Sequence, residues 1–326
     1  MKTFLTGGTG YIGSAFIKKL IDTGHEVVAL YHSQPPDFQA QGLTWVQGSL
    51  TNVNSLVEAM SGCRQVYHMA GLARISHPDK NAFFNINVKG TENVLRAAVF
   101  NEIEKLVYTS TGAVFSYSIN TAIRESDPLL EPLNDDYSVT KFMAEQKLIE
   151  AAKNGLHAVI VNPPRVYGPG KSTESSPVNK IIEDYLKKSF YFVPGNGKYI
   201  GNYVFMEDVL NGHLLAMEKG KPGERYILGG ENYDYREFYG ILADITKLKR
   251  KRIGVPRWMM DTAVKANGFF ATITGQRPKI TSAIISKLYS NHQLSSKKAV
   301  HELGYTITPL EKGLELTLAS LQKQAS

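Results

Sequence analysis

The sequence has almost no cysteine and no long apolar run, and each shortage excludes a class of protein. Cys63 is the only cysteine in 326 residues, so an internal disulfide framework is excluded, and no metal-ligand spacing surrounds it. Gly7 interrupts the opening apolar run, so no signal peptide is expected. The most apolar late stretch, 258–275, contains Asp261 and Lys265 and is typical of a core or interfacial helix. We therefore expect a cytoplasmic protein with no membrane partner and no metal.

Acidic residues are fewer than basic ones, and the formal net charge is +7. This excess favours anionic ligands without specifying one. The densest basic run, 247–252, has no interleaved aromatics and no nucleic-acid motif, so a solvated helix end explains it better than nucleic acid does. The hydrophobic fraction of 43% is that of a globular protein, and the length suggests about two domains.

Three glycines near the N-terminus predict a dinucleotide site. Residues 2–6 form a short strand-like run that leads into Gly7, Gly10 and Gly13, and an apolar-periodic helix follows. Glycine permits a tight turn, a close approach to a pyrophosphate and close packing of the helix. The free N–H groups at the helix start add about half a positive charge for the pyrophosphate. The cofactor-binding residues predicted in this loop are Gly7, Gly10, Tyr11, Ile12 and Gly13.

The end of the second predicted strand bears on the choice of cofactor. An acid at this place would bind the ribose 2′-hydroxyl of NAD. The chain instead has Tyr31, His32 and Ser33 after the strand 26–31, and no acid occurs before Asp37. Nothing there repels a 2′-phosphate, and His32 and Ser33 can donate hydrogen bonds to it. We predict NADP as the cofactor, with NAD as the alternative because no arginine is nearby.

Strands and helices alternate along the first half of the chain. This alternation predicts an α/β fold, a doubly wound parallel sheet of the Rossmann kind with right-handed crossovers. The expected strands after the first are 26–31, 43–47, 65–69 and 105–110, and the expected helices include 53–60, 82–100 and one from Asp135–Asp136 to about Lys153.

Tyr137 and Lys141 are four residues apart on the last of these helices, so they share a helix face. A free tyrosine has a pKa near 10 and exchanges protons poorly at neutral pH. A cation at ~4 Å is worth about 4 kcal/mol at an effective dielectric of 20, which would lower that pKa by several units. The pair therefore predicts a phenol tuned for general acid–base catalysis, although this spacing also arises often by chance.

Several motifs together resemble the extended short-chain dehydrogenases/reductases. This family also covers epimerases and dehydratases that use nicotinamide cofactors. The motifs are TGGTGYIG at 6–13, TST at 109–111, YSVTK at 137–141, HMAG at 68–71, NVKGT at 87–91 and NPPRVYGPG at 162–170. Residues 202–209 and 295–305 extend the resemblance over nearly the whole chain, and the latter is similar to the dihydroflavonol-reductase-like branch.

The resemblance implies a role for each matching residue. Tyr137 would donate or accept the proton, and Lys141 would lower its pKa and bind the nicotinamide ribose. Thr111 would stand in for the catalytic serine of the family and orient the substrate oxygen, with Ser110 as its possible substitute. Ser49 replaces an aspartate that the family usually places near the adenine. The further cofactor-binding positions implied are Ser49, Leu50, Met69, Ala70, Gly71, Asn87, Thr109, Tyr137, Lys141, Pro163 and Val166.

The alternation weakens after residue 170. We expect a Rossmann domain of residues 1–170 plus 201–230, in which 201–230 returns to the sheet. A smaller, mainly helical substrate-binding lobe would comprise 171–200 plus 231–326. Arg165 falls in the nicotinamide loop, where a structural role is favoured. Aromatic residues are dense where the substrate crevice is expected, and this favours a largely apolar substrate; they are Phe83, Phe84, Phe190, Tyr191, Phe192, Tyr199 and Tyr203.

Three functions fit these observations. The favoured one is an NADP(H)-dependent reductase of a ketone or aldehyde, or an oxidoreductase working in the alcohol-oxidising direction. The second is a nucleotide-sugar epimerase or dehydratase with tightly bound NAD, and the third is a nucleotide-binding sensor without catalysis. The predicted partners are a small carbonyl or alcohol substrate and a second copy of the chain. In the resembling family the helices matching 82–100 and 138–153 commonly pair in a homodimer.

Overall fold

The computed structural model describes residues 1–34, 36–74, 77, 79, 81–170, 176–274 and 281–325. Of residues 268–274 and 323–325 only the backbone is described. Its main sheet has seven parallel strands in the order β10-β6-β5-β4-β1-β2-β3. The strands are β1 (Lys2–Thr6), β2 (Glu26–Tyr31), β3 (Leu43–Gln47), β4 (Gln65–His68), β5 (Lys105–Thr109), β6 (Ala158–Val161) and β10 (Arg225–Tyr226). The order runs outward in both directions from β1, which is the predicted doubly wound arrangement.

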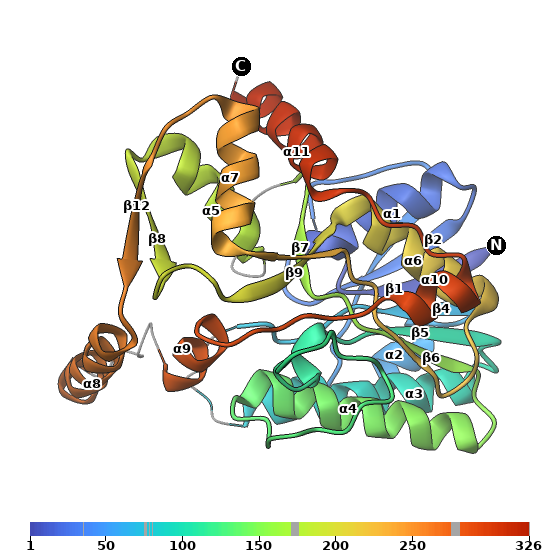
Figure 1. Cartoon of the computed structure of the whole chain (residues 1–326). Coiled ribbons are helices and arrows are strands. Elements are labelled where there is room, and N and C mark those ends of the chain that lie inside the picture. Colours follow the sequence, from blue (N-terminus) through green and yellow to red (C-terminus); the bar gives the residue numbers. More distant parts are fainter. Residues whose placement is uncertain are drawn as a thin grey trace.

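Helices cover both faces of this sheet (Figure 1). α1 (Tyr11–Asp22), α6 (Met206–Lys219) and α10 (Lys297–Leu303) pack on one face, and α2 (Val53–Ala59), α3 (Gly90–Phe100) and α4 (Asp136–Lys153) on the other. β2 shows why both faces need cover. Val27 and Ala29 join the first core, whereas Val28 and Leu30 join the second. Successive side chains of a strand point to opposite faces, so an apolar run is buried on both.

The predicted elements lie close to the observed ones. The helix expected at 82–100 consists of a π-helical segment, η1 (Phe84–Lys89), and then α3. The N-terminus of α4 lies where the sequence predicts it, and the Asp135 carboxylate accepts a hydrogen bond from the Ser138 N–H at 3.0 Å. None of the helices in the described ranges is both long and apolar enough to cross a bilayer.

Two small sheets lie beside the main one. β7 (Arg165–Tyr167), β9 (Ile200–Phe205) and β11 (Glu231–Asp234) form the first, and β8 (Phe190–Pro194) pairs with β12 (Lys251–Val255) in the second. The return of 201–230 to the main sheet is therefore only partly correct, because β10 joins it but β9 pairs with β7 and β11. The accompanying helices are α5 (Pro177–Lys187), α7 (Tyr235–Thr246), α8 (Arg257–Thr274), α9 (Ser282–Leu288) and α11 (Leu310–Ala325). The two-domain division remains a prediction.

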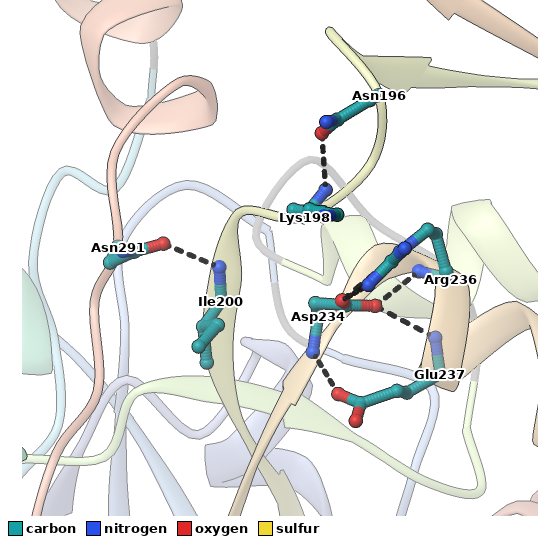
Figure 2. Close-up of polar contacts among 7 residues, drawn as sticks. All are labelled: Asn196, Lys198, Ile200, Asp234, Arg236, Glu237 and Asn291. Carbon is teal, nitrogen blue, oxygen red and sulfur yellow. Dashed lines mark hydrogen bonds and ion pairs between the residues drawn. The ribbon is translucent and has the colours of Figure 1, made fainter.

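The start of α7 is fixed by a reciprocal cap (Figure 2). The Asp234 carboxylate accepts from the Glu237 N–H at 2.9 Å, and the Glu237 carboxylate accepts from the Asp234 N–H at 2.8 Å. Tyr235 is therefore held as the first residue of the helix. Beside it, the Asn291 side chain accepts from the Ile200 N–H at 2.9 Å and holds the segment after α9 against the start of β9.

Candidate active site

The glycine loop has the shape that a dinucleotide requires. Gly7 has a φ of +83°, and a β-carbon there would lie 2.6 Å from the Ala70 nitrogen. A β-carbon on Gly13 would lie 2.1 Å from the Gly7 carbonyl oxygen, so this glycine packs against the loop itself. Among the described residues, a β-carbon on Gly10 would meet only the Gly7 oxygen within 4 Å, at 3.2 Å. In the same part of the chain no side chain caps the start of α1, so its first N–H groups are available to an anion. These features fit a pyrophosphate.

Tyr11 and Ile12 contribute to this loop through their backbone. The Tyr11 hydroxyl donates to the Gly168 carbonyl at 3.0 Å and accepts from the Asn179 amide at 2.9 Å. Burial raises the pKa of this phenol. Ile12 packs against the core under the sheet. Both side chains therefore pack against protein, which leaves the backbone N–H groups of this first turn of α1 to hold the predicted phosphate.

The residues predicted for the adenosine end lie after β2 and β3. Tyr31 is half-buried, and His32 and Ser33 are exposed. The Ser49 hydroxyl lies 2.9 Å from that of Thr51. Leu50 contacts α3, where a β-carbon on Gly90 would lie 2.9 Å from its own β-carbon. No carboxylate follows β2 directly, as the sequence indicates.

The loop after β4 lies between the glycine loop and α4. The backbone of Met69 and Ala70 in this loop packs directly against Gly7 of the glycine loop. Asn87 holds the next part of the loop, because its carboxamide accepts from the Leu72 N–H at 2.7 Å and donates to the Thr140 hydroxyl at 3.0 Å. A β-carbon on Gly71 would lie 3.7 Å from Lys141 Nζ. The predicted cofactor residues of β4 and α4 are thus brought together.

Lys141 is buried next to the end of β5. Its ammonium donates to the Thr109 carbonyl at 2.7 Å and lies 4.1 Å from the centre of the Tyr108 ring. Burial lowers the pKa of Lys141 to about 7, and the carboxylate of Glu145, one turn further along α4, opposes this shift. The side chain is held by protein groups and directed toward the sheet end, where Gly71 lies.

Tyr137 has a pKa raised to about 12, because burial disfavours the phenolate more than a hydrogen bond with the Thr111 side chain favours it. The predicted lowering of this pKa by Lys141 is therefore wrong for the free protein. The ammonium of Lys141 is itself desolvated and bonded to Thr109, so the simple two-charge argument omits the dominant effect.

Thr111 faces a cavity that Ser110 does not line. Thr111 precedes the short turn η2 (Gly112–Val114), whose first N–H donates to the Pro163 carbonyl at 2.9 Å. Asn162 donates to the Thr111 carbonyl at 3.2 Å and to the Glu145 carboxylate at 2.6 Å. Val166 is buried on β7. The threonine is thus fixed by the predicted nicotinamide loop.

The cavity at Thr111 has a volume of about 290 Å³. Its apolar lining includes Ala113, Phe115, Leu133, Pro132, Pro164 and Pro177. The prediction that seven aromatic residues line the substrate crevice is wrong for this cavity, since none of them is among its lining residues. Phe190 and Phe192 are instead 41% and 59% exposed on β8, and Tyr191 stacks on Tyr239.

Three cationic or titratable residues at the cavity were not assigned to it by sequence. Arg165 begins β7, Lys287 lies on α9, and His292 follows α9. The Lys287 ammonium lies 2.7 Å from the Asp135 carboxylate. Burial, with the charges of Arg165 and Lys287, lowers the pKa of His292 to about 4. No local pattern marks the residues at and after α9, because only the tertiary fold brings them to Thr111.

Comparison with known proteins gives a consistent picture. A sequence model of the NAD dependent epimerase/dehydratase family matches residues 3–229. A Synechocystis protein provisionally named a dihydroflavonol 4-reductase is 31% identical over 95% of this chain and 92% of its own length. A Stenotrophomonas maltophilia protein named 2-alkyl-3-oxoalkanoate reductase is 26% identical, covering 98% of this chain and 99% of its own.

A solved structure of UDP-glucose 4-epimerase from Thermotoga maritima superimposes with a TM-score of 0.82 over the whole of both chains, at 23% identity. This likeness shows the fold. The family match covers the glycine loop, Thr111, Tyr137 and Lys141, and the relatives are named as enzymes. The chain therefore belongs to the NAD dependent epimerase/dehydratase family, as an NAD(P)-dependent enzyme of the extended short-chain dehydrogenase/reductase type.

Proposed function

We propose that the protein is an NADP(H)-dependent reductase of a small, largely apolar ketone or aldehyde. The observation that carries this proposal is the cavity at Thr111, which has an apolar lining and reaches Asp135, two residues before Tyr137. A relative from Stigmatella aurantiaca is 31% identical over 94% of this chain and is named a ketoreductase of a farnesyl dihydroquinoline oxide. Both the cavity and the name fit carbonyl reduction.

Each residue of the candidate site has a separate role in the proposed reaction. A reduced nicotinamide, when bound, supplies the hydride. The glycine loop would hold its pyrophosphate, and Lys141 its ribose. Thr111 would orient the carbonyl oxygen by a hydrogen bond, and Tyr137 would give that oxygen a proton. Burial raises the pKa of Tyr137, which keeps the phenol protonated at neutral pH and also makes it a weaker acid than a free tyrosine.

The test is a screen of ketones and aldehydes that follows the absorbance of NADPH. Multiple turnovers with consumption of NADPH are expected. A nucleotide-sugar epimerase or dehydratase would instead be purified with tightly bound NAD and would return the hydride within one turnover. Bound nicotinamide together with epimerisation of UDP-glucose would contradict the proposed reductase.

The choice of NADP can be tested at Tyr31. Tyr31→Asp is expected to reverse a preference for NADP over NAD, because a carboxylate at the end of β2 would accept from the ribose diol and repel a 2′-phosphate. The repulsion between the introduced carboxylate and a 2′-phosphate is expected to change the ratio of the dissociation constants for NADP and NAD by tenfold or more. Calorimetric titration with both cofactors measures that ratio, and Tyr31→Phe serves as the uncharged control. A wild-type protein that prefers NAD would contradict the assignment.

We also propose a homodimer that pairs α3 and α4, which lie side by side along one face (Figure 1). Both helices expose apolar side chains there, since Phe100 is 73% and Met143 38% exposed. Sedimentation at micromolar concentration is expected to give a dimer, and Phe100→Glu to shift it toward monomer. Phe192→Glu, on the exposed strand β8, is the matched control. A clean wild-type monomer would refute this pairing.

A further inference from the structure

Arg165 is a cation at the cavity that the proposed reduction does not use. Its guanidinium donates from Nη1 to the hydroxyl groups of Tyr203 at 3.1 Å and Tyr235 at 3.4 Å. Within the described ranges no Asp or Glu side chain forms an ion pair with it. Both bonds leave from Nη1, and no residue within the described ranges accepts from Nη2 or Nε, so these two groups can donate to a ligand. An arginine keeps its charge, and a desolvated charge without a counter-ion is costly.

The position of this guanidinium is fixed by the surrounding backbone and rings. A β-carbon on Gly201 would lie 2.2 Å from Nη1, so the group lies directly against the β9 backbone. The rings of Tyr203 and Tyr235 lie 5.4 and 5.5 Å from its central carbon. Tyr235 is the first residue of α7, directly after the capping residue Asp234. Ordering of the side chain therefore costs little when a ligand binds.

The other basic groups at the cavity do not supply an unpaired positive charge. Lys287 pairs with the Asp135 carboxylate at 2.7 Å and donates to the Ser138 hydroxyl at 3.0 Å. The lowered pKa of His292 leaves its ring neutral at neutral pH. Glu131 is exposed at the rim. Among the lining residues that the structure describes, Arg165 is thus the cation without a counter-charge.

We propose that the substrate is an oxo acid whose carboxylate Arg165 binds while its carbonyl lies at Thr111. The planar guanidinium matches a carboxylate with two parallel hydrogen bonds, and the apolar lining accommodates the carbon chain. Both residues line the same cavity, so one small molecule can reach both. This inference rests on the proposed function, because it names a second group on the substrate of that reaction.

The experiment compares acids with their neutral esters. The 2-oxo, 3-oxo and 4-oxo octanoates and their methyl esters are offered to the NADPH-loaded enzyme, and kcat and KM are measured. Wild type is expected to prefer one of the acids over its ester by about 10- to 100-fold in kcat/KM, the range for one hydrogen-bonded charge. Arg165→Met should remove the preference by raising KM for the acid, with the ester little changed. Lys287→Met, which removes a cation that is already paired, should keep the ratio.

The outcomes separate the inference from the reaction. A wild-type enzyme that reduces the ester as well as the acid overturns the inference and leaves the reductase standing. Failure to reduce any carbonyl compound in the wider screen refutes the reductase. Calorimetry with octanoate and methyl octanoate then decides the role of Arg165 by itself, and equal affinity overturns it. Tighter binding of UDP-glucose than of octanoate would assign Arg165 to a diphosphate and also overturn it. These wild-type measurements decide the matter even where Arg165→Met does not fold.

Discussion

Tyr137→Phe is expected to lower kcat for carbonyl reduction by about 10²–10⁴-fold, the usual worth of general acid–base catalysis. The substitution removes only the phenol oxygen, the group proposed to give the proton. The aromatic ring remains in its half-buried place on α4. Affinity for NADP(H), measured by titration calorimetry, is therefore expected to stay close to that of wild type.

The control for this variant is Tyr117→Phe. Tyr117 lines the cavity at Thr111 and has no role in the proposed proton transfer. It should retain more than a tenth of the wild-type kcat. The same retention by Tyr137→Phe would show that another group supplies the proton. Loss of cofactor binding in Tyr137→Phe would instead indicate that the substitution disturbs the site as a whole.

The glycine loop and the sheet could be predicted because their signals are local. Gly7 and Gly13 are required by backbone contacts within the loop and with the β4 turn, and those positions recur at fixed spacing. Asp135 likewise marks the start of α4 by a bond to a residue three positions later. The continuous apolar run of β2 is explained by two buried faces. Each of these features is encoded within a few residues of where it acts.

The cavity could not be predicted in the same way. Phe190 and Phe192 have the composition of a crevice lining, but the pairing of β8 with β12 leaves them exposed. Lys287 and His292 reach Thr111 only through the path of the chain around α9. The place of Arg165 in its loop favours a structural role, whereas its contacts with Tyr203 and Tyr235 fix it at the cavity, which sequence spacing does not reveal.

The environment of Tyr137 shows a different limit. Sequence spacing identifies Lys141 as its neighbour on one helix face, and this leads to an attraction that lowers the pKa of the phenol. It does not reveal that both groups are desolvated, or that the ammonium donates to the Thr109 carbonyl. Burial is a property of the packed fold, and here it outweighs the pairwise charge effect.

Gly10→Val is expected to abolish measurable NADP(H) binding, with an affinity loss of at least about 10²-fold, because its side chain would displace hydrogen bonds to a charged phosphate. The fold should tolerate the change. Gly10 has an extended backbone with φ of −84°, and of the residues that the structure describes a β-carbon there meets only the Gly7 oxygen, at 3.2 Å. The melting temperature should therefore remain near that of wild type.

Gly13→Ala is the matched variant three residues later. Its β-carbon would lie 2.1 Å from the Gly7 carbonyl oxygen and 2.8 Å from its carbon, so the loop must shift. Overpacking of this kind costs about 1–3 kcal/mol, and Gly13→Ala should lower the melting temperature as well as the affinity. Thermal unfolding and calorimetric titration of both variants separate the two roles. Normal NADP affinity in Gly10→Val would show that the pyrophosphate does not bind at this loop. A loss of stability equal to that of Gly13→Ala would show that Gly10 has a structural role.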